Sequence, residues 1–350
     1  MKAYVLNGIN DLSKEETKVP EVTENSVLIH MKAAGICGSD IPRIYKTGAH
    51  VHPIIPGHEF SGVVVKTFDN KDAGMLGKAV GIFPLIPCMK CPMCQKKHYE
   101  MCRSYSYLGS RCDGGFAEYA VVPKWNIIDL PPNVSMKSAA LLEPLSVAVH
   151  AVRRLQKSTP ADSRIVVIGL GTIGLMIVAT LISEGYENVR VIGNKDLQKN
   201  MCLALGLSED RYTDLKTTDL LENVLEKTGG GADVVFECAG RNNAVATAVE
   251  IAAPTGRIIY VSNPESDIVF PKNVYWKILR NQLEIKGTWN SSFTHEEDDD
   301  WHFALKLLSE KRVDYEKLIT HEFSLNDLEK GLDIMKNKTD DYIKIMIVNE

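Results

Sequence analysis

The chain has 350 residues, of which 45% are hydrophobic and 24% charged. This balance is typical of a soluble globular protein, and the length suggests two domains. The 40 Lys and Arg residues against 45 Asp and Glu give a net charge of −5, which argues against a basic surface for nucleic acid or anionic membranes.

The N-terminal residues 1–12 contain no basic segment followed by a long apolar core. We therefore expect no secretory signal, and a cytoplasmic protein whose cysteines are reduced. The apolar stretch 165–182 is just long enough to suggest a membrane span, but three glycines interrupt it. We favour a buried strand, turn and helix for this stretch.

The first part of the chain, residues 1–148, is predicted to be rich in strands and turns. Short apolar runs at 27–31, 62–65 and 117–122 are separated by Gly, Pro and Asn, the usual pattern of strands joined by turns. Helical structure is predicted from about residue 138 onward, because residues 139–151 are almost entirely apolar.

Three scattered residues in this part, Cys37, His58 and Glu143, are of types that bind zinc. Each of them alone is more often an ordinary packed residue, because a lone cysteine behaves as a small hydrophobic side chain. Their spacing does not unite them into one site.

Four cysteines form a much stronger signal. Cys88, Cys91, Cys94 and Cys102 offer four thiols within a short segment, which matches the four soft ligands of a structural, tetrahedral zinc site. Such a closed site would order a lobe that is too small for its own core. A redox pair is the alternative, but the surrounding sequence does not resemble a thioredoxin-like unit.

From residue 163 onward, strands alternate with helices. This order predicts a parallel sheet with crossover helices, hence an α/β fold of the doubly wound Rossmann type. The expected strands lie at residues 165–168, 189–192, 234–238 and 258–261, and helices are expected at 197–205 and 244–253.

The glycine motif Gly-x-Gly-x-x-Gly follows the first of these strands and opens a helix, the context expected of a dinucleotide-binding turn. Gly169 permits the tight turn, Gly171 allows the backbone to approach a pyrophosphate, and Gly174 allows close packing. Thr172 and Ile173 lie between them, at the helix N-terminus that would face the phosphates.

The second strand ends in Gly193-Asn194-Lys195, where enzymes that use NAD usually carry an acidic residue for the adenosine ribose. Without a carboxylate at this point, a 2′-phosphate is not repelled and Lys195 could pair with it. We therefore favour NADP over NAD. The alternative is that Asp196 contacts the ribose after a shift of the loop.

In chain order, these motifs resemble those of the medium-chain zinc-dependent alcohol dehydrogenases, and the resemblance covers essentially the whole chain. It rests on Gly-Ile-Cys-Gly-Ser-Asp, Gly-His-Glu, the cysteine segment, Asp-Gly-Gly-Phe-Ala-Glu, Glu-Pro-Leu-Ser-Val-Ala and the glycine motif. Glu143, where simple alcohol dehydrogenases carry Cys, is similar to the polyol and threonine dehydrogenase branch.

The resemblance implies a second zinc ion, the catalytic one. It would be held by Cys37, by His58 and, directly or through water, by Glu143. Glu59 adjoins this site and would exchange with water or substrate as a ligand. A site with three protein ligands keeps one position open for a substrate oxygen.

The resemblance also assigns two supporting roles. Asp40 would accept a hydrogen bond from the second ring nitrogen of His58 and so fix its tautomer. Ser39 would contact the substrate hydroxyl and start a proton relay. The implied reaction is hydride transfer between a secondary alcohol and NAD(P).

The implied substrate is a polyol or a polyol phosphate. The segment 287–293, followed by Trp301, is most similar to the dehydrogenases of galactitol 1-phosphate, with Arg43 or Lys46 available to the phosphate. Sorbitol, threonine or butanediol are alternative substrates within the family. A metal-free reductase of related fold and a non-catalytic cofactor-binding protein are competing interpretations, and the metal ligands argue against both.

The domain organisation follows from the same resemblance. We expect a GroES-like catalytic domain from residues 1–148 and 283–350, and a Rossmann domain from residues 149–282. A strand near residues 283–287 would form an exposed sheet edge. In the family this region pairs two subunits, which implies a homodimer or a homotetramer.

Overall fold

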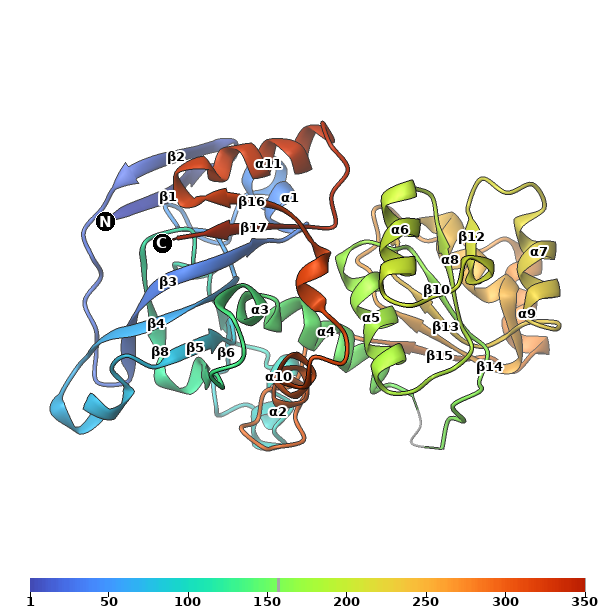
Figure 1. Ribbon diagram of the computed structural model, residues 1–350, viewed down its shortest axis with the longest axis horizontal. Coiled ribbons are helices and arrows are strands. Elements are labelled where there is room, and N and C mark those ends of the chain that lie inside the picture. Colours follow the sequence, from blue (N-terminus) through green and yellow to red (C-terminus); the bar gives the residue numbers. More distant parts are fainter. Residues whose placement is uncertain (156–157, 350) are drawn as a thin grey trace. The chain divides into compact units, whose positions relative to one another are not determined.

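The computed structural model describes residues 1–155 and 158–349 and divides into two compact units (Figure 1). The first unit is discontinuous, with segments Met1–Pro144, Ser292–Lys311 and Tyr315–Glu350. The second unit comprises Leu145–Ser291 and Arg312–Asp314. The chain thus leaves the first unit and returns to it.

The first unit is built on a seven-stranded sheet. Its strands in spatial order are β16 (Ile319–Ser324), β17 (Lys344–Val348), β3 (Ser26–Ile36), β4 (Glu59–Thr67), β5 (Ala79–Ile82) and β9 (Ile127–Asp129), with β8 (Tyr119–Pro123) also paired to β3. Strands β16 and β17 are parallel neighbours, and the other described pairs of this sheet are antiparallel. Along one edge, β3 pairs first with β8 and then with β17, so it is the central strand.

Smaller elements complete this unit. Two further sheets have two strands each: β1 (Lys2–Gly8) with β2 (Asp11–Glu16), and β6 (Leu85–Ile86) with β7 (Ser106–Tyr107). The helices are α1 (Asp40–Pro42), α2 (Pro92–Gln95), α3 (Met136–Ala140), α10 (Asp300–Glu310) and α11 (Leu328–Asn337), with a π-helical turn at Arg43–Thr47. Short 3₁₀ turns lie at Asn70–Met75, Tyr99–Met101, Lys124–Asn126, Tyr315–Leu318 and Leu325–Asp327.

The helical structure that we predicted from about residue 138 onward is present, and it is divided into two helices. Helix α3 ends at Ala140, and α4 (Leu142–Val152) begins two residues later. Pro144 explains the new start, since proline has no N–H group and is tolerated only in the first turn of a helix. Glu143 consequently lies at the beginning of α4.

The second unit contains a six-stranded parallel sheet. In spatial order its strands are β12 (Tyr212–Asp214), β11 (Val189–Gly193), β10 (Ile165–Ile168), β13 (Ala232–Glu237), β14 (Ala252–Tyr260) and β15 (Glu284–Gly287). The order reverses between β10 and β13, which is the switch point of a doubly wound fold. The connecting helices are α5 (Thr172–Ser183), α6 (Asp196–Ala204), α7 (Leu220–Lys227), α8 (Asn242–Ile251) and α9 (Lys272–Arg280). The predicted fold class, a Rossmann sheet and a mostly β domain in one chain, is confirmed.

The division between the units falls later than residue 282. Strand β15 pairs with β14 and therefore lies in the parallel sheet. The chain joins the first unit at Ser292, where Phe293 and Trp301 are fully buried against Phe83, with ring centroids 5.0 and 5.3 Å away. The names catalytic and dinucleotide-binding domain remain predictions for these two units.

The apolar stretch at residues 165–182 forms strand β10, a turn and part of the 12-residue helix α5. No helix in the described part of the chain is long and apolar enough to cross a membrane. Most of this stretch is instead buried in the second unit, and only the turn around Gly171 is exposed.

Candidate active site

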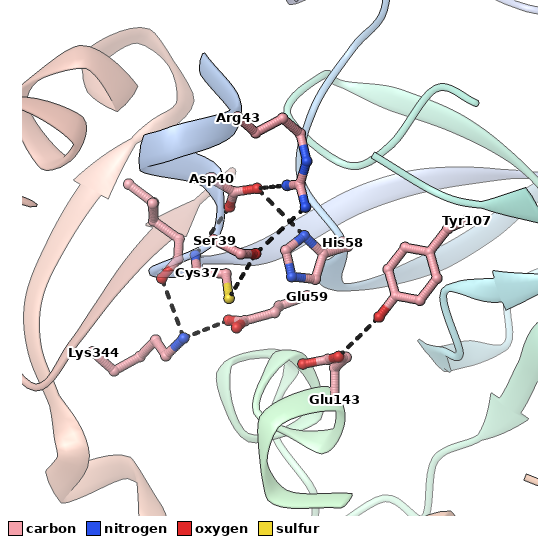
Figure 2. A network of polar contacts seen from close by, with 10 residues as sticks. Cys37, Ser39, Asp40, Arg43, His58, Glu59, Tyr107, Glu143 and Lys344 are labelled. Carbon is pink, nitrogen blue, oxygen red and sulfur yellow. Dashed lines mark hydrogen bonds and ion pairs between the residues drawn. The ribbon is translucent and has the colours of Figure 1, made fainter. Parts of the chain in front are cut away.

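The strand register of the first unit brings three polar side chains together. Cys37 follows the last residue of β3, Glu59 opens β4 opposite Gly35, and Lys344 opens β17 beside Ile36. Because the three strands are neighbours, these positions meet at one end of the sheet (Figure 2). The site is therefore placed by backbone pairing between segments that are far apart in sequence.

Three of the predicted zinc ligands form a compact group. One donor atom each from Cys37, His58 and Glu59 lies within 4.8 Å of the others. Gly35 is needed for this arrangement, because a Cβ atom there would lie 2.2 Å from Oε2 of Glu59. A thiol, an imidazole and a carboxylate are the donor types that zinc accepts in sites with an open position.

Asp40 lies close to His58, and the hydrogen bond between them that the resemblance implied stays a prediction. Its Oδ1 is 3.4 Å from Nδ1 of His58, and its Oδ2 accepts a hydrogen bond of 3.0 Å from the backbone N–H of Cys37. The Arg43 guanidinium also contacts Oδ1 of Asp40. Full burial of Asp40 opposes ionisation, but His58 and Arg43 outweigh it and lower the pKa of Asp40. The opposite nitrogen of the His58 ring lies on the side of Cys37 and Glu59 (Figure 2).

Ser39 is also part of the group. Its hydroxyl donates a hydrogen bond of 3.3 Å to Sγ of Cys37, and Nη2 of Arg43 lies 3.5 Å from the same hydroxyl. The contact of Ser39 with a substrate stays a prediction. Arg43 contacts both Asp40 and Ser39 and so holds these two side chains in position.

The partner of Glu59 is a residue that the sequence did not reveal. Nζ of Lys344 lies 2.6 Å from Oε2 of Glu59 and 3.2 Å from the backbone oxygen of Ile36. Both charged side chains are buried, with exposed fractions of 3% and 1%. Burial alone would lower the pKa of Lys344, but the neighbouring Glu59 and Cys37 raise it.

Glu143 stands apart from the group of three. Its Oε1 accepts a hydrogen bond of 3.1 Å from the Tyr107 hydroxyl (Figure 2). Burial raises the pKa of Glu143 to about 7, the attraction of His58 opposes this shift, and the charge of Glu59 adds to it. The predicted role of Glu143 as a direct or water-mediated zinc ligand stays a prediction, and Tyr107 was not predicted.

The charges of this buried cluster suit a divalent metal. Without metal, the neighbouring Asp40 and Cys37 raise the pKa of His58 well above its usual range, and burial raises the pKa of Glu143 to about 7. Metal binding needs a deprotonated thiol and a neutral imidazole, and a divalent cation would stabilise these forms and the ionised carboxylates around it. The acidic groups are Cys37, Asp40, Glu59 and Glu143, and the cationic ones are Arg43 and Lys344.

The four-cysteine segment also fits zinc. Its sulfur atoms lie within 4.8 Å of one another, with separations of 3.9 Å for Cys88–Cys94, 3.5 Å for Cys91–Cys94 and 3.9 Å for Cys91–Cys102. A tetrahedron with zinc–sulfur bonds of about 2.3 Å has sulfur–sulfur edges of about 3.8 Å, whereas a disulfide needs about 2.05 Å. Backbone N–H groups of Cys94 and Arg103 lower the pKa of Cys91 to about 6.

The second unit holds the glycine motif at the carboxyl end of β10. Gly169 has a φ of +88°, and a Cβ at Gly174 would lie 2.0 Å from the backbone oxygen of Gly169. Gly171 precedes Thr172 and Ile173 at the start of α5, and a Cβ there would meet nothing within 4 Å. The motif thus packs tightly on the protein side and is open where a pyrophosphate would approach.

A pocket beside this motif is lined by Gly169, Gly193, Asn194, Gln198 and Arg241, among others. None of the described residues that line it is acidic. A Cβ at Gly193 would lie 2.8 Å from Leu170 and from the Tyr212 hydroxyl, so this position has no room for a carboxylate. Lys195 and Asp196 adjoin the pocket at the start of α6.

Comparison with protein families gives two matches. Residues 23–132 match the alcohol dehydrogenase GroES-like domain, and residues 172–310 match the zinc-binding dehydrogenase family. Galactitol 1-phosphate 5-dehydrogenase from Escherichia coli (strain K12) is 32% identical over 96% of this chain and 97% of its own length. L-threonine 3-dehydrogenase from Bacillus subtilis (strain 168) is also 32% identical, over 92% of this chain and 91% of its own.

Solved structures agree with this assignment. The crystal structure of galactitol-1-phosphate dehydrogenase from Escherichia coli has a TM-score of 0.87 and 31% identity, covering 99% of this chain and all of its own. A putative zinc-binding dehydrogenase from Sinorhizobium meliloti 1021, bound to NADP, has a TM-score of 0.88 and 25% identity, covering 99% of this chain and 98% of its own. The predicted family and fold are therefore confirmed.

Proposed function

Because the chain belongs to the zinc-dependent alcohol dehydrogenase family, we propose that this enzyme oxidises a secondary alcohol of a polyol phosphate, with galactitol 1-phosphate as the favoured substrate. The relative named for that substrate matches almost the whole chain. The observation that carries the proposal is the group of Cys37, His58 and Glu59, in which His58 and Glu59 are buried and the donor atoms are of types that suit a catalytic zinc ion.

The residues of the chain would share the chemistry as follows. A bound zinc ion supplies Lewis-acid stabilisation of an alcohol oxygen, and a bound nicotinamide accepts the hydride. Cys37 and His58 would hold the metal, and Asp40 would orient His58 through Nδ1. Arg43 holds Asp40 in place. We propose that the Ser39 hydroxyl accepts the proton of the substrate hydroxyl.

We propose two zinc ions per chain, one in this group and one in the four-cysteine lobe. Metal analysis of purified protein tests this, because a non-catalytic cofactor-binding protein would retain only the ion of the lobe. A Cys37→Ala variant should lose turnover and one zinc ion while it still binds the cofactor; retained turnover would remove Cys37 from its role.

The four-cysteine lobe would bind metal only when its thiols are reduced, which supports a cytoplasmic location.

The cofactor is proposed to be NADP. The support is the non-acidic pocket, the crowding at Gly193 and the nearby Lys195. In a Lys195→Ala variant, kcat/KM with NADP should fall about tenfold relative to kcat/KM with NAD. If the wild-type enzyme prefers NAD and Asp196→Ala abolishes that preference, Asp196 contacts the ribose and the proposal fails.

The substrate is best tested by an activity matrix. Galactitol 1-phosphate, sorbitol, threonine and 2,3-butanediol are each assayed with NAD and with NADP. We expect the highest kcat/KM with galactitol 1-phosphate, and preference for an unphosphorylated compound would reject the assignment. Lys46 is exposed, so Lys46→Ala should raise KM for the phosphate ester and leave sorbitol turnover unchanged.

The assembly is proposed to be a homodimer or a homotetramer. Strand β15 is an outer strand of the parallel sheet, and exposed apolar side chains lie on it and on α9: Tyr275, Trp276, Leu279 and Ile285. Unpaired strand edges and apolar patches of this kind favour association. Light scattering after size exclusion tests this, and a monomer at micromolar concentration would contradict it.

A further inference from the structure

Tyr107 contacts two members of the metal site at once. Its hydroxyl donates a hydrogen bond of 3.1 Å to Oε1 of Glu143. Its ring meets the His58 ring edge to face, with centroids 5.8 Å apart and an interplanar angle of 61°. Figure 2 shows the phenol and the Glu143 carboxylate pointing toward each other beside the group of three.

The backbone holds Tyr107 firmly. Tyr107 lies in β7 and pairs with Leu85 of β6. Its carbonyl oxygen accepts backbone hydrogen bonds of 3.2, 2.9 and 3.2 Å from Ser110, Arg111 and Cys112. The segment between β6 and β7 is the four-cysteine lobe, so a metal ion in that lobe would close the loop that presents Tyr107.

The hydrogen bond limits what Glu143 can offer a metal. A carboxylate can bind a cation through one or both of its oxygens. Cys37, His58 and Glu59 already provide three donors, and two more oxygens would fill the position that a substrate needs. The Tyr107 hydroxyl takes up one lone pair of Oε1 and draws charge from that oxygen, so Oε2 is the better donor to a metal.

We propose that Tyr107 is a positioning residue: its hydroxyl restricts Glu143 to a single metal-facing oxygen and so keeps a coordination position open for substrate. This inference rests on the proposed function, because it presumes a catalytic metal in the group of three. The signal for it lies in tertiary structure alone, since Tyr107 is one of several tyrosines in its segment.

The test is Tyr107→Phe, which keeps the ring against His58 and removes one hydrogen bond. Residues that orient a metal ligand commonly contribute about tenfold to a hundredfold. We expect kcat to fall about tenfold, with zinc content and cofactor affinity unchanged. Tyr105→Phe is the matched control, because Tyr105 touches the Tyr107 ring and Arg111 through its own ring, and it should match the wild type.

A second readout does not need turnover. With Co²⁺ in the catalytic site, the visible absorption reports the number of ligands, since five-coordinate cobalt absorbs more weakly than four-coordinate cobalt. Tyr107→Phe should lower this absorption, and Tyr105→Phe should not. The change should vanish when Glu143→Gln is added, because the hydroxyl acts through Glu143.

The outcomes separate the two hypotheses. If Tyr107→Phe matches the wild type in kcat and in the cobalt spectrum, the positioning role is wrong. If its effect is undiminished in the Glu143→Gln background, Tyr107 acts by another route and the inference also fails. If the wild type oxidises none of the polyols, the proposed function fails, while the cobalt spectra still decide the role of Tyr107.

Discussion

The buried pair of Lys344 and Glu59 gives the sharpest stability prediction. Lys344→Met keeps the length of the side chain but removes the cation 2.6 Å from Glu59. Glu59 is then left as a buried carboxylate with an exposed fraction of 1%. Removing one partner of such a pair is costly, because the other charge loses its compensation without regaining water.

The expected loss is about 3–5 kcal/mol in the free energy of unfolding. For a unit of about 150–250 residues, each kcal/mol lowers the melting temperature by about 2–4 °C. We therefore expect the melting temperature of the first unit to fall by about 6–20 °C. In zinc-loaded protein the fall in melting temperature should be near 6 °C, the lower end of this range, because the metal is a second cation beside Glu59.

Differential scanning calorimetry of matched variants is the assay. Lys330→Met is the control, since Lys330 forms a pair of 2.8 Å with Asp327 on the surface, where such pairs contribute about 0–1 kcal/mol. The double variant Lys344→Met/Glu59→Gln should regain most of the loss, because no unpaired charge remains. The reasoning is refuted if Lys344→Met melts with the control, or if the double variant is no more stable.

Three other predictions concern cofactor, metal and pH. Gly171→Ala should keep thermal stability but weaken NADP binding at least about tenfold in a fluorescence titration, whereas Gly174→Ala should lower the melting temperature, because its Cβ would lie 2.0 Å from a backbone oxygen. Cys91→Ser should lose one zinc ion by mass spectrometry and also reduce kcat, because the loop presenting Tyr107 is no longer closed; full activity would disconnect the lobe from the site. Burial opposes ionisation of Glu316, but two serine hydroxyls outweigh it and lower its pKa below 4.5. The ionised Glu316 therefore stabilises the fold fully above pH 4.5, and this stabilisation is lost as the pH falls through the lower pKa of the folded state. In a plot of melting temperature against pH, Glu316→Gln should remove the part of the slope that lies between these two pKa values and leave the rest unchanged.

The parts of the site that the sequence predicts are those with a local signal. The glycine motif predicts its turn from sequence alone, because three glycines at fixed spacing follow an apolar strand. The cysteine lobe is equally local. Cys37, His58 and Glu59 come from residues near strand ends, and their grouping was implied only by family resemblance before the structure brought them within 4.8 Å.

The site residues that the sequence did not predict are brought to the site by the pairing of strands that are distant in sequence. Lys344 sits in an otherwise apolar strand, where a lysine would be expected to face water. It is buried because β17 lies beside β3, which no local pattern reveals. Tyr107 is similar, since its role depends on the register of a two-residue strand. The strand expected at residues 283–287 is β15, and its pairing with β14 keeps the chain in the second unit as far as Ser291.

The pairing of β3 with β17 has a consequence for biosynthesis. Lys344 and the carbonyl of Ile36 that it contacts are 308 positions apart, and the whole parallel sheet is translated between them. The second unit has mostly local crossovers and can fold while the chain is still on the ribosome. In the first unit, one edge of β3 stays partly unpaired until β17 has been synthesised. Chaperones that act during synthesis should therefore bind mainly near the unpaired part of β3. Metal binding should be among the last maturation steps.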